Sequence, residues 1–219
     1  MKRTILTKVV CLILVLAAGM TILSGALAGT STENGKSTPS GDASLQKELD
    51  SLPPFKFEKH KYGIGYGSCP VYTAPSTDAY RCANGKATCD TNHAMDDAGY
   101  VNGWLMVRYE TNNGSTRVGY IPPKYIKGYV SSMYPHFGYI PATAEDTILV
   151  TDNPMMHGTS FARLERGETF HILSKYNYYK KDGLEWWYIE CTVDGQIAYG
   201  FIEYYDSNFS LGDNNLGDG

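Results

Sequence analysis

The residues most suited to catalysis in this sequence are its five cysteines and five histidines. A cysteine nucleophile needs a lowered thiol pKa, which a helix N-terminus or a neighbouring histidine supplies. Cys69 is followed directly by Pro70 in a strand-like segment, and Cys82 is followed by Asn84 and Gly85 rather than by a helical pattern. The sequence contains neither a Gly-x-Ser-x-Gly elbow nor a phosphate-binding glycine loop. These observations predict that the protein is not an enzyme.

A metal site is the next chemistry to consider. Cys82, Cys89 and His93 have a Cys-x6-Cys-x3-His spacing, whereas zinc sites use cysteine pairs two to four residues apart. The acidic pairs Asp96-Asp97 and Glu203 with Asp206 are more typical of solvated turns. The sequence therefore predicts no metal and no cofactor.

Four cysteines follow the N-terminal apolar segment, namely Cys69, Cys82, Cys89 and Cys191. If the chain is exported, as its N-terminal segment predicts below, these cysteines can form disulfides. Their spacing does not reveal the pairing. Cys82 and Cys89 could close a short loop. In the alternative interpretation all four are reduced and buried as small hydrophobic residues. The sequence leaves both possibilities open.

Tyrosine is the enriched residue type, with 18 copies in the chain. Its ring supplies apolar area and its hydroxyl a polar contact, which suits binding sites that are partly wet. The predicted ligand-binding residues are Tyr80, Tyr100, Tyr176, Tyr178 and Tyr179. The alternative for the last three is a loop that folds back on its own domain. The residues predicted to form the structural core are Trp104, Tyr120, Trp186 and Phe201.

The first 28 residues have the pattern of a secretory signal peptide. Lys2, Arg3 and Lys8 precede a long apolar run, and Ala26 and Ala28 provide the small residues of a cleavage site. The alternative is an uncleaved membrane anchor, because 20 apolar residues can just span a bilayer. Residues 29–52 are rich in Ser, Thr and Gly and are predicted to be a flexible linker. The protein is therefore expected to be secreted, and it could remain associated with the cell surface.

Charge narrows the class of partner. Removing residues 1–28 removes three basic side chains and no acidic one, which changes the formal net charge from −4 to −7. Nucleic-acid binding requires clustered Lys and Arg, and the sequence has no such cluster. An acidic chain is also poorly suited to electrostatic binding of anionic wall polymers. A neutral glycan or a peptide fits better, and a membrane is a partner only if the N-terminal segment stays attached.

The rest of the chain shows short strand patterns instead of helical periodicity. Residues 104–109 alternate in character, residues 112–114 read as a tight hairpin turn, and residues 117–121 return as the next strand. Residues 186–191 open in the same way, Asp194-Gly195 forms a second bend, and residues 198–202 return. Aligning Trp104 with Trp186 places Gly119 opposite Gly200, one residue out of step. The sequence therefore predicts an all-β protein built from a diverged tandem repeat.

The repeat divides the chain into predicted segments. Residues 53–128 form a first barrel, residues 129–140 a connector that packs against one or both barrels, and residues 141–206 a second barrel. Residues 207–219 are rich in Gly, Asp and Asn and are predicted to be a disordered tail. The first unit also carries a long excursion at residues 76–98.

These motifs carry a resemblance to a known family. Gly103-Trp104-Leu105-Met106-Val107, a bend and then Val118-Gly119-Tyr120-Ile121 resemble the bacterial SH3 (SH3b) domain. Trp186-Trp187-Tyr188-Ile189 with Gly200-Phe201-Ile202 resemble a second copy, and Val71-Tyr72-x-x-Pro75 is similar to the family's first strand and turn. The excursion at residues 76–98 departs from the pattern. The resemblance covers residues 60–206.

The resemblance implies two tandem SH3-like β-barrels that bind ligands through surface loops. Such domains often accompany cell-wall hydrolases as targeting modules and are not themselves enzymes. The expected function is non-catalytic recognition of cell-wall material, either peptidoglycan peptide or glycan. The alternative is a protein–protein interaction module that docks an exported partner. Fold alone does not decide between these functions.

Overall fold

The computed structural model describes residues 40–41, 43–59, 63–126, 128–129, 131–156, 159–179, 184–204 and 207–212. All described residues belong to one compact unit, Lys36–Gly219. The predicted signal peptide lies outside the described residues, as do residues 29–39 of the predicted linker. No helix among the described residues is long and apolar enough to span a bilayer.

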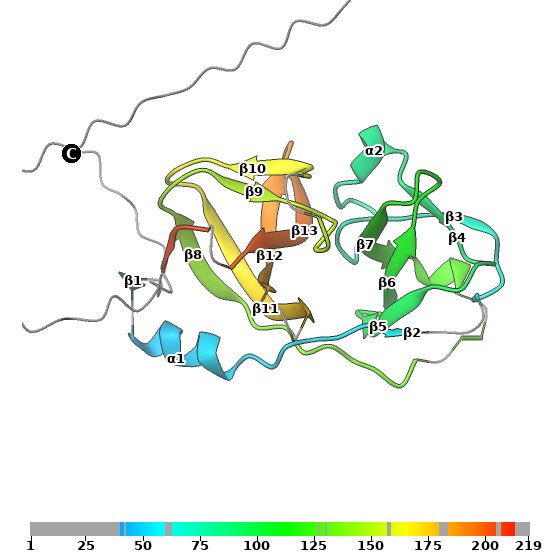
Figure 1. The fold of residues 1–219 in the computed structure, drawn as a ribbon, viewed down its shortest axis with the longest axis horizontal. Coiled ribbons are helices and arrows are strands. Elements are labelled where there is room, and N and C mark those ends of the chain that lie inside the picture. The colour runs from blue at the N-terminus through cyan, green and yellow to red at the C-terminus, as the bar shows by residue number, and fades with distance from the viewer. Residues whose placement is uncertain are drawn as a thin grey trace, which may run out of the picture. The chain divides into compact units, whose positions relative to one another are not determined.

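The first half of the described chain contains a four-stranded sheet and a two-stranded ribbon. The sheet has the order β2-β5-β6-β7, with strands Glu58–Lys59, Asp96–Val101, Trp104–Glu110 and Thr116–Ile121. The ribbon pairs β3, Ser68–Pro70, with β4, Thr88–Asp90. A short helix α2, Cys82–Gly85, lies between β3 and β4 in the chain, and a 3-10 turn, Pro123–Tyr125, follows β7. Figure 1 shows these elements in cyan and green.

The second half is organised around a six-stranded sheet with the order β1-β14-β8-β11-β12-β13 (Figure 1). Its strands are Ser40–Gly41, Phe209–Leu211, Ile140–Ala144, Thr169–Tyr179, Leu184–Val193 and Gln196–Glu203. A separate ribbon pairs β9, Ile148–Val150, with β10, Ala162–Leu164. Most of the ordered elements are strands, which confirms the all-β class. The hydrogen-bonded strands of the described residues form open sheets and do not close into the predicted barrels.

Both halves use the same local contact between a glycine-containing strand and an earlier valine. Tyr72 bridges to Tyr120 in the first half, and Thr151 bridges to Phe201 in the second, both antiparallel. A Cβ on Gly119 would lie 2.4 Å from Val71 Cγ1, and a Cβ on Gly200 would lie 2.5 Å from Val150 Cγ1. Glycine is needed at both positions because the valine side chain occupies the space that a Cβ would take.

The strand register explains the one-residue offset between the two halves. Leu105 pairs with Ile121 in the first hairpin, and Trp187 pairs with Ile202 at the corresponding place in the second. The second hairpin turns through Asp194 and Gly195, which have positive φ angles of 50° and 76°, as a two-residue type I′ turn requires. The first hairpin turns through residues 111–115 instead. The additional residue is therefore accommodated in the hairpin loop, and the strands stay in phase.

One buried cluster contains side chains from both halves. Trp104, Met106, Val118 and Tyr120 come from the first half, and they pack with residues of the second: Leu173, Tyr176, Trp186, Tyr188 and Phe201. Tyr120 and Tyr188 hydroxyls are 3.0 Å apart at its centre. An ion pair between Arg117 and Asp152, 2.5 Å apart, also joins the halves. The two halves therefore share a core, unlike domains that are connected only by a linker.

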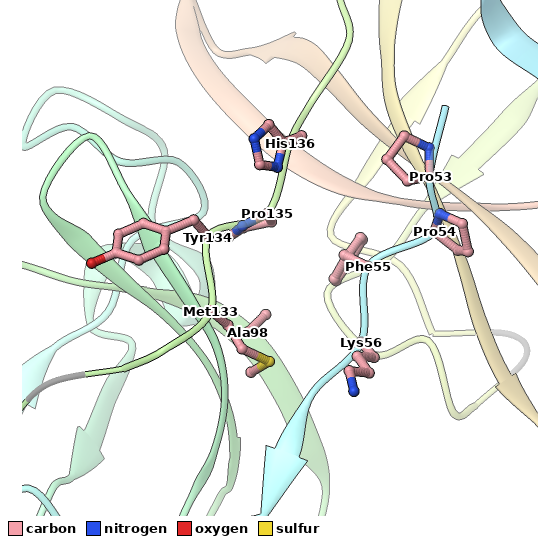
Figure 2. Close-up of a pocket in the computed structure, with 9 residues that line it drawn as sticks. All are labelled: Pro53, Pro54, Phe55, Lys56, Ala98, Met133, Tyr134, Pro135 and His136. Carbon is pink, nitrogen blue, oxygen red and sulfur yellow. The ribbon is translucent and has the colours of Figure 1, made fainter. Parts of the chain in front are cut away.

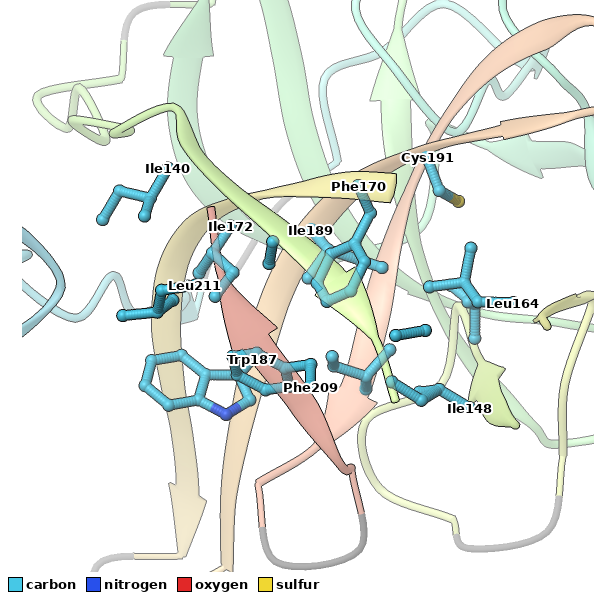
Figure 3. Packing of buried hydrophobic residues seen from close by; sticks show 14 of the residues in the cluster. Ile140, Ile148, Leu164, Phe170, Ile172, Trp187, Ile189, Cys191, Phe209 and Leu211 are labelled. Atoms are coloured by element: carbon cyan, nitrogen blue, oxygen red, sulfur yellow. The ribbon is translucent and has the colours of Figure 1, made fainter. Parts of the chain in front are cut away.

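Two further clusters each belong mainly to one half. Ile64, Leu105, Val107 and Ile121 pack with other residues in the first half. The larger cluster in the second half lies over the six-stranded sheet and is shown in Figure 3. It includes Leu49 of α1, Ala43–Ser51, which is fully buried.

The ends of the described chain are more ordered than the sequence predicts. Helix α1 and strand β1 occupy the C-terminal part of the predicted flexible linker, because the buried Leu49 side chain attaches the helix to the second-half core. Residues 209–211 form β14 instead of a disordered tail. Phe209 packs edge-on against Phe170 at 5.6 Å and against Trp187 at 6.1 Å. Residues 213–219 lie outside the described part of the chain.

The buried hydroxyls predict a loss of stability at alkaline pH. Burial raises the pKa of Tyr120 and Tyr188 above the ordinary value of 10, and burial raises the pKa of the Cys191 thiol to about 12 from 9. The unfolded chain then releases these protons at lower pH than the folded chain. The free energy of unfolding is expected to fall as pH rises above about 9, with each group contributing about 1.4 kcal/mol per pH unit until it also ionises in the folded state.

Denaturant unfolding at pH 8 and pH 10.5 measures this loss. Replacing Tyr120 and Tyr188 together by phenylalanine removes both hydroxyls of the buried pair, so neither is left without a partner. The double variant should lose less stability between the two pH values than the original chain. An identical loss of stability in both proteins would contradict a role of the buried hydroxyl pair in the alkaline destabilisation.

Candidate ligand-binding pocket

A pocket of about 220 Å³ is lined by three segments that are far apart in the chain. Residues 53–56 form one side, residues 133–136 form the other, and Ala98 of β5 completes the lining. Figure 2 shows these two extended segments facing one another, with Met133 and Ala98 close together. The pocket therefore depends on contacts made by both halves of the molecule.

The first wall is attached to strand β11 of the second half. The Phe55 N–H donates to the Lys175 carbonyl at 3.2 Å, and the Ser174 hydroxyl donates to the Pro53 carbonyl at 3.0 Å. Phe55 stacks on Tyr176 with ring centroids 5.0 Å apart. These bonds hold residues 53–56 in an extended conformation, which Pro53 and Pro54 already favour.

The second wall is attached to strand β5 of the first half. The Tyr100 N–H donates to the Met133 carbonyl at 3.2 Å, and the Ser131 hydroxyl donates to the buried Asp97 carboxylate at 2.7 Å. Tyr129 donates its hydroxyl to the same carboxylate. Gly99 lies between these contacts at a register shift in β5 and has a φ of 101°. The carbonyl of Met133 occupies the space that a Cβ at this position would need.

The lining of the pocket is mainly proline, aromatic and aliphatic. Pro53, Pro54 and Pro135 present rigid apolar surfaces, and Tyr134 is 63% exposed. The Tyr134 ring lies 6.5 Å from the Tyr100 ring, centroid to centroid. Lys56 adds a positive charge to the lining and pairs with Glu58 at 3.3 Å on the exposed surface. The lining contains neither a carboxylate nor a thiol, so it is suited to binding through apolar contact with a charged edge.

The predicted tyrosines do not gather into one site. Tyr100 lies beside the pocket, and its hydroxyl donates to the Tyr129 carbonyl at 2.7 Å. Tyr80 instead stacks on Phe161 of the second half at 5.7 Å. Tyr176 is 3% exposed and packs in the shared cluster, so its ring face is covered by Phe55 and is not available to a ligand from solvent. The side chains of Tyr178 and Tyr179 lie outside the described residues.

The excursion at residues 76–98 serves a structural contact in this region. The Tyr80 N–H donates to the Ile197 carbonyl at 2.9 Å, and Gln196 donates to the Asp78 carbonyl at 3.1 Å. Both bonds reach the last hairpin of the second half.

The residues predicted to form the core are all buried: Trp104 (9% exposed), Tyr120 (0%), Trp186 (2%) and Phe201 (0%).

A polar cluster lies on the six-stranded sheet, apart from the pocket lining. The Tyr139 hydroxyl donates to Glu190 Oε1 at 2.6 Å, and the same oxygen lies 3.7 Å from His171 Nδ1. The Tyr139 ring stacks on the His171 ring at 3.7 Å. The hydrogen bond to Glu190 raises the pKa of Tyr139 to about 12. These groups satisfy one another, which favours a role in holding Tyr139 against the sheet.

The chain matches no protein-family model, no curated protein and no solved structure. In the part of the chain that the structure describes, no three His, Cys, Asp or Glu side chains are grouped as metal ligands would be.

The principal pocket residues are not among those predicted from the sequence. Tyr134 and Pro135 belong to the predicted connector, where several aromatic residues indicated packing but no site. Pro53 and Pro54 were placed at the start of the first barrel. The available signal was the presence of proline beside aromatic residues in two segments, but only their attachment to opposite halves brings these segments together.

Proposed function

We propose that this protein is a secreted, non-catalytic binding protein that recognises cell-wall material through the pocket between residues 53–56 and 133–136. Peptidoglycan stem peptide is the preferred ligand class. A peptide backbone can lie against the proline and tyrosine surfaces, and a peptide carboxylate can pair with Lys56. The observation that carries this proposal is the combination of rigid apolar walls, the exposed Tyr134 ring and a positive charge in one pocket.

The tandem SH3b resemblance remains part of the proposal. It is supported by the bridges that pair Tyr72 with Tyr120 and Thr151 with Phe201, because the residues aligned from the sequence occupy corresponding positions in the two halves. The proposed binding surface differs from the one that the resemblance implies. It lies between the repeats and includes the connector, instead of residing in the tyrosine-rich loop of the second unit.

Replacing Tyr134 by alanine is expected to weaken retention on purified, teichoic-acid-free peptidoglycan about five- to tenfold. Loss of one aromatic stacking surface accounts for a change of this size. Because Tyr134 is 63% exposed, the variant should keep its stability within about 0.5 kcal/mol. Sedimentation of the chain with wall material, followed by quantification of bound and free protein, measures the effect.

Tyr66 provides a matched control, since it is also exposed, at 42%, and does not line the pocket. The Tyr66→Ala variant should sediment like the original chain. Titration with soluble stem peptides and with peptide-free glycan strands then separates the two ligand classes. Failure of the original chain to sediment at any salt concentration would exclude wall binding, and recovery of one exported protein in its place would favour the docking alternative.

A further inference from the structure

Two of the four cysteines that the structure describes face one another across the β3–β4 ribbon. Cys69 and Cys89 are register partners, and their Sγ atoms are 3.5 Å apart. Both side chains are buried, with 1% and 5% of their surface exposed. The four cysteines are present as thiols in this structure. The sequence alone could not choose among their possible pairings.

The backbone of the ribbon suits a covalent link at this position. The Val71 N–H donates to the Ala87 carbonyl, and the Thr91 N–H donates to the Gly67 carbonyl, each at 3.0 Å. These bonds lie two residues from the cysteine pair on either side, which places Cys69 and Cys89 at a hydrogen-bonded position of the antiparallel ladder. Cα atoms at such positions are about 5.5 Å apart, which is the commonest separation in disulfides. The two sulfurs need to approach by only about 1.5 Å.

We propose that Cys69 and Cys89 are an oxidation site that forms an intramolecular disulfide, while Cys82 and Cys191 remain thiols. The proposal does not depend on the proposed wall-binding function. Cys82 is the first residue of α2 and is only partly buried. Cys191 lies on β12 within the second-half cluster and pairs with Ala198. Neither is a register partner of another cysteine.

The electrostatics of the pair favour Cys69 as the sulfur that reacts first. The hydrogen bond that the two sulfurs share lowers the pKa of the Cys69 thiol, whereas the same hydrogen bond and burial raise the pKa of Cys89. The Cys82 thiol has its pKa raised by burial and by the Asp152 charge. A thiolate is the attacking species in disulfide exchange, so Cys69 is the best nucleophile of this pair.

The oxidant is a disulfide, either oxidised glutathione or the disulfide of an extracytoplasmic oxidoreductase. The Cys69 thiolate attacks one sulfur of that disulfide, which forms a mixed disulfide and releases one thiolate. Cys89 loses its proton to solvent and attacks the Cys69 sulfur, which releases the second thiolate. The two protein thiols are oxidised by two electrons and the external disulfide is reduced to two thiols. Because both cysteines are buried, exchange is expected during folding or local opening of the ribbon.

Peptide mapping of the full chain tests the pairing. The chain is unfolded, refolded in mixtures of oxidised and reduced glutathione, blocked with N-ethylmaleimide, digested and analysed by mass spectrometry. The expected product contains the Cys69 and Cys89 peptides linked together, with Cys82 and Cys191 carrying maleimide. Linkage of any other pair, or maleimide on both Cys69 and Cys89 at every glutathione ratio, would overturn the proposal.

Thermal unfolding gives a second readout. Oxidation closes a 20-residue separation in the chain, and the oxidised protein should melt about 6–12 °C above its reduced form. The Cys89→Ser variant should show no difference between oxidised and reduced samples, whereas Cys82→Ser and Cys191→Ala should retain it. If Cys89→Ser does not fold, the Cys69→Ala/Cys89→Ala double variant replaces it. A melting difference that survives in the double variant would also overturn the proposal.

Discussion

Replacing Phe201 by alanine is expected to lower the free energy of unfolding by about 3–5 kcal/mol and to loosen both halves of the molecule together. Phe201 is fully buried, and its ring lies 4.7 Å from the Tyr188 ring and 5.5 Å from the Tyr176 ring. It belongs to the cluster that also contains Trp104 and Tyr120 of the first half. A cavity at this position therefore removes packing from both halves.

Hydrogen exchange measured strand by strand shows whether the loss of amide protection extends from the second half to the first. Amides of β6 and β7 should lose protection in Phe201→Ala along with those of β12 and β13, because the two halves share the disrupted cluster. Ile197 is on the same strand as Phe201 but is 51% exposed, so Ile197→Ala should change stability by less than about 0.5 kcal/mol. Unaltered protection of β6 and β7 in the Phe201 variant would show that the halves unfold independently.

Replacing Gly99 by alanine is expected to detach the connector from β5 and to destroy the pocket. The new Cβ would lie 1.9 Å from the Met133 carbonyl oxygen and 2.3 Å from its carbon. Backbone atoms cannot swing aside as the end of a flexible side chain can, so residue 133 must move and the hydrogen bond from Tyr100 is lost. The positive φ of 101° adds strain for any residue with a Cβ. The combined loss of stability should be about 3 kcal/mol or more.

The Gly114→Ala variant separates backbone strain from the steric clash of a new Cβ. Gly114 also has a positive φ, 79°, but a Cβ there would meet no atom within 4 Å. Gly114→Ala should cost about 1–2 kcal/mol through backbone strain alone. It should leave wall retention unchanged, while Gly99→Ala should abolish that retention. Denaturant unfolding and wall sedimentation of both variants make the comparison, and equal losses of stability would contradict steric exclusion at Gly99.

The proposed disulfide and the pocket can be tested separately because they use different segments. The β3–β4 ribbon contains Cys69 and Cys89, whereas the pocket is lined by residues 53–56, Ala98 and residues 133–136. Loss of wall retention in Tyr134→Ala is therefore expected to leave the oxidised and reduced melting temperatures separated by the same amount. Loss of the disulfide is likewise expected to leave wall retention through Tyr134 unchanged.

The turns and strand phases of this protein follow from its sequence because they depend on neighbouring residues. Asp194-Gly195 supplies two positive φ angles. Alternation around Trp104 and Trp186 separates each strand into two faces, and the two faces are buried in different clusters. Asn102-Gly103 forms a similar turn, with φ angles of 50° and 81°, and carries the same local signal. Local backbone preferences and period-two alternation are enough to indicate an all-β chain with two related hairpins.

Only the tertiary structure decided what the tyrosines, cysteines and prolines do. Tyr176 is of a residue type that suits binding sites. Its ring is nevertheless covered by Phe55, which lies more than 100 residues earlier in the chain. Cys69 meets Cys89, and not Cys82, because the ribbon register places them opposite each other. The pocket exists because two extended segments are hydrogen-bonded to different halves that share one core. Burial and proximity of this kind depend on which distant surfaces pack together, and short-range sequence patterns do not contain that information.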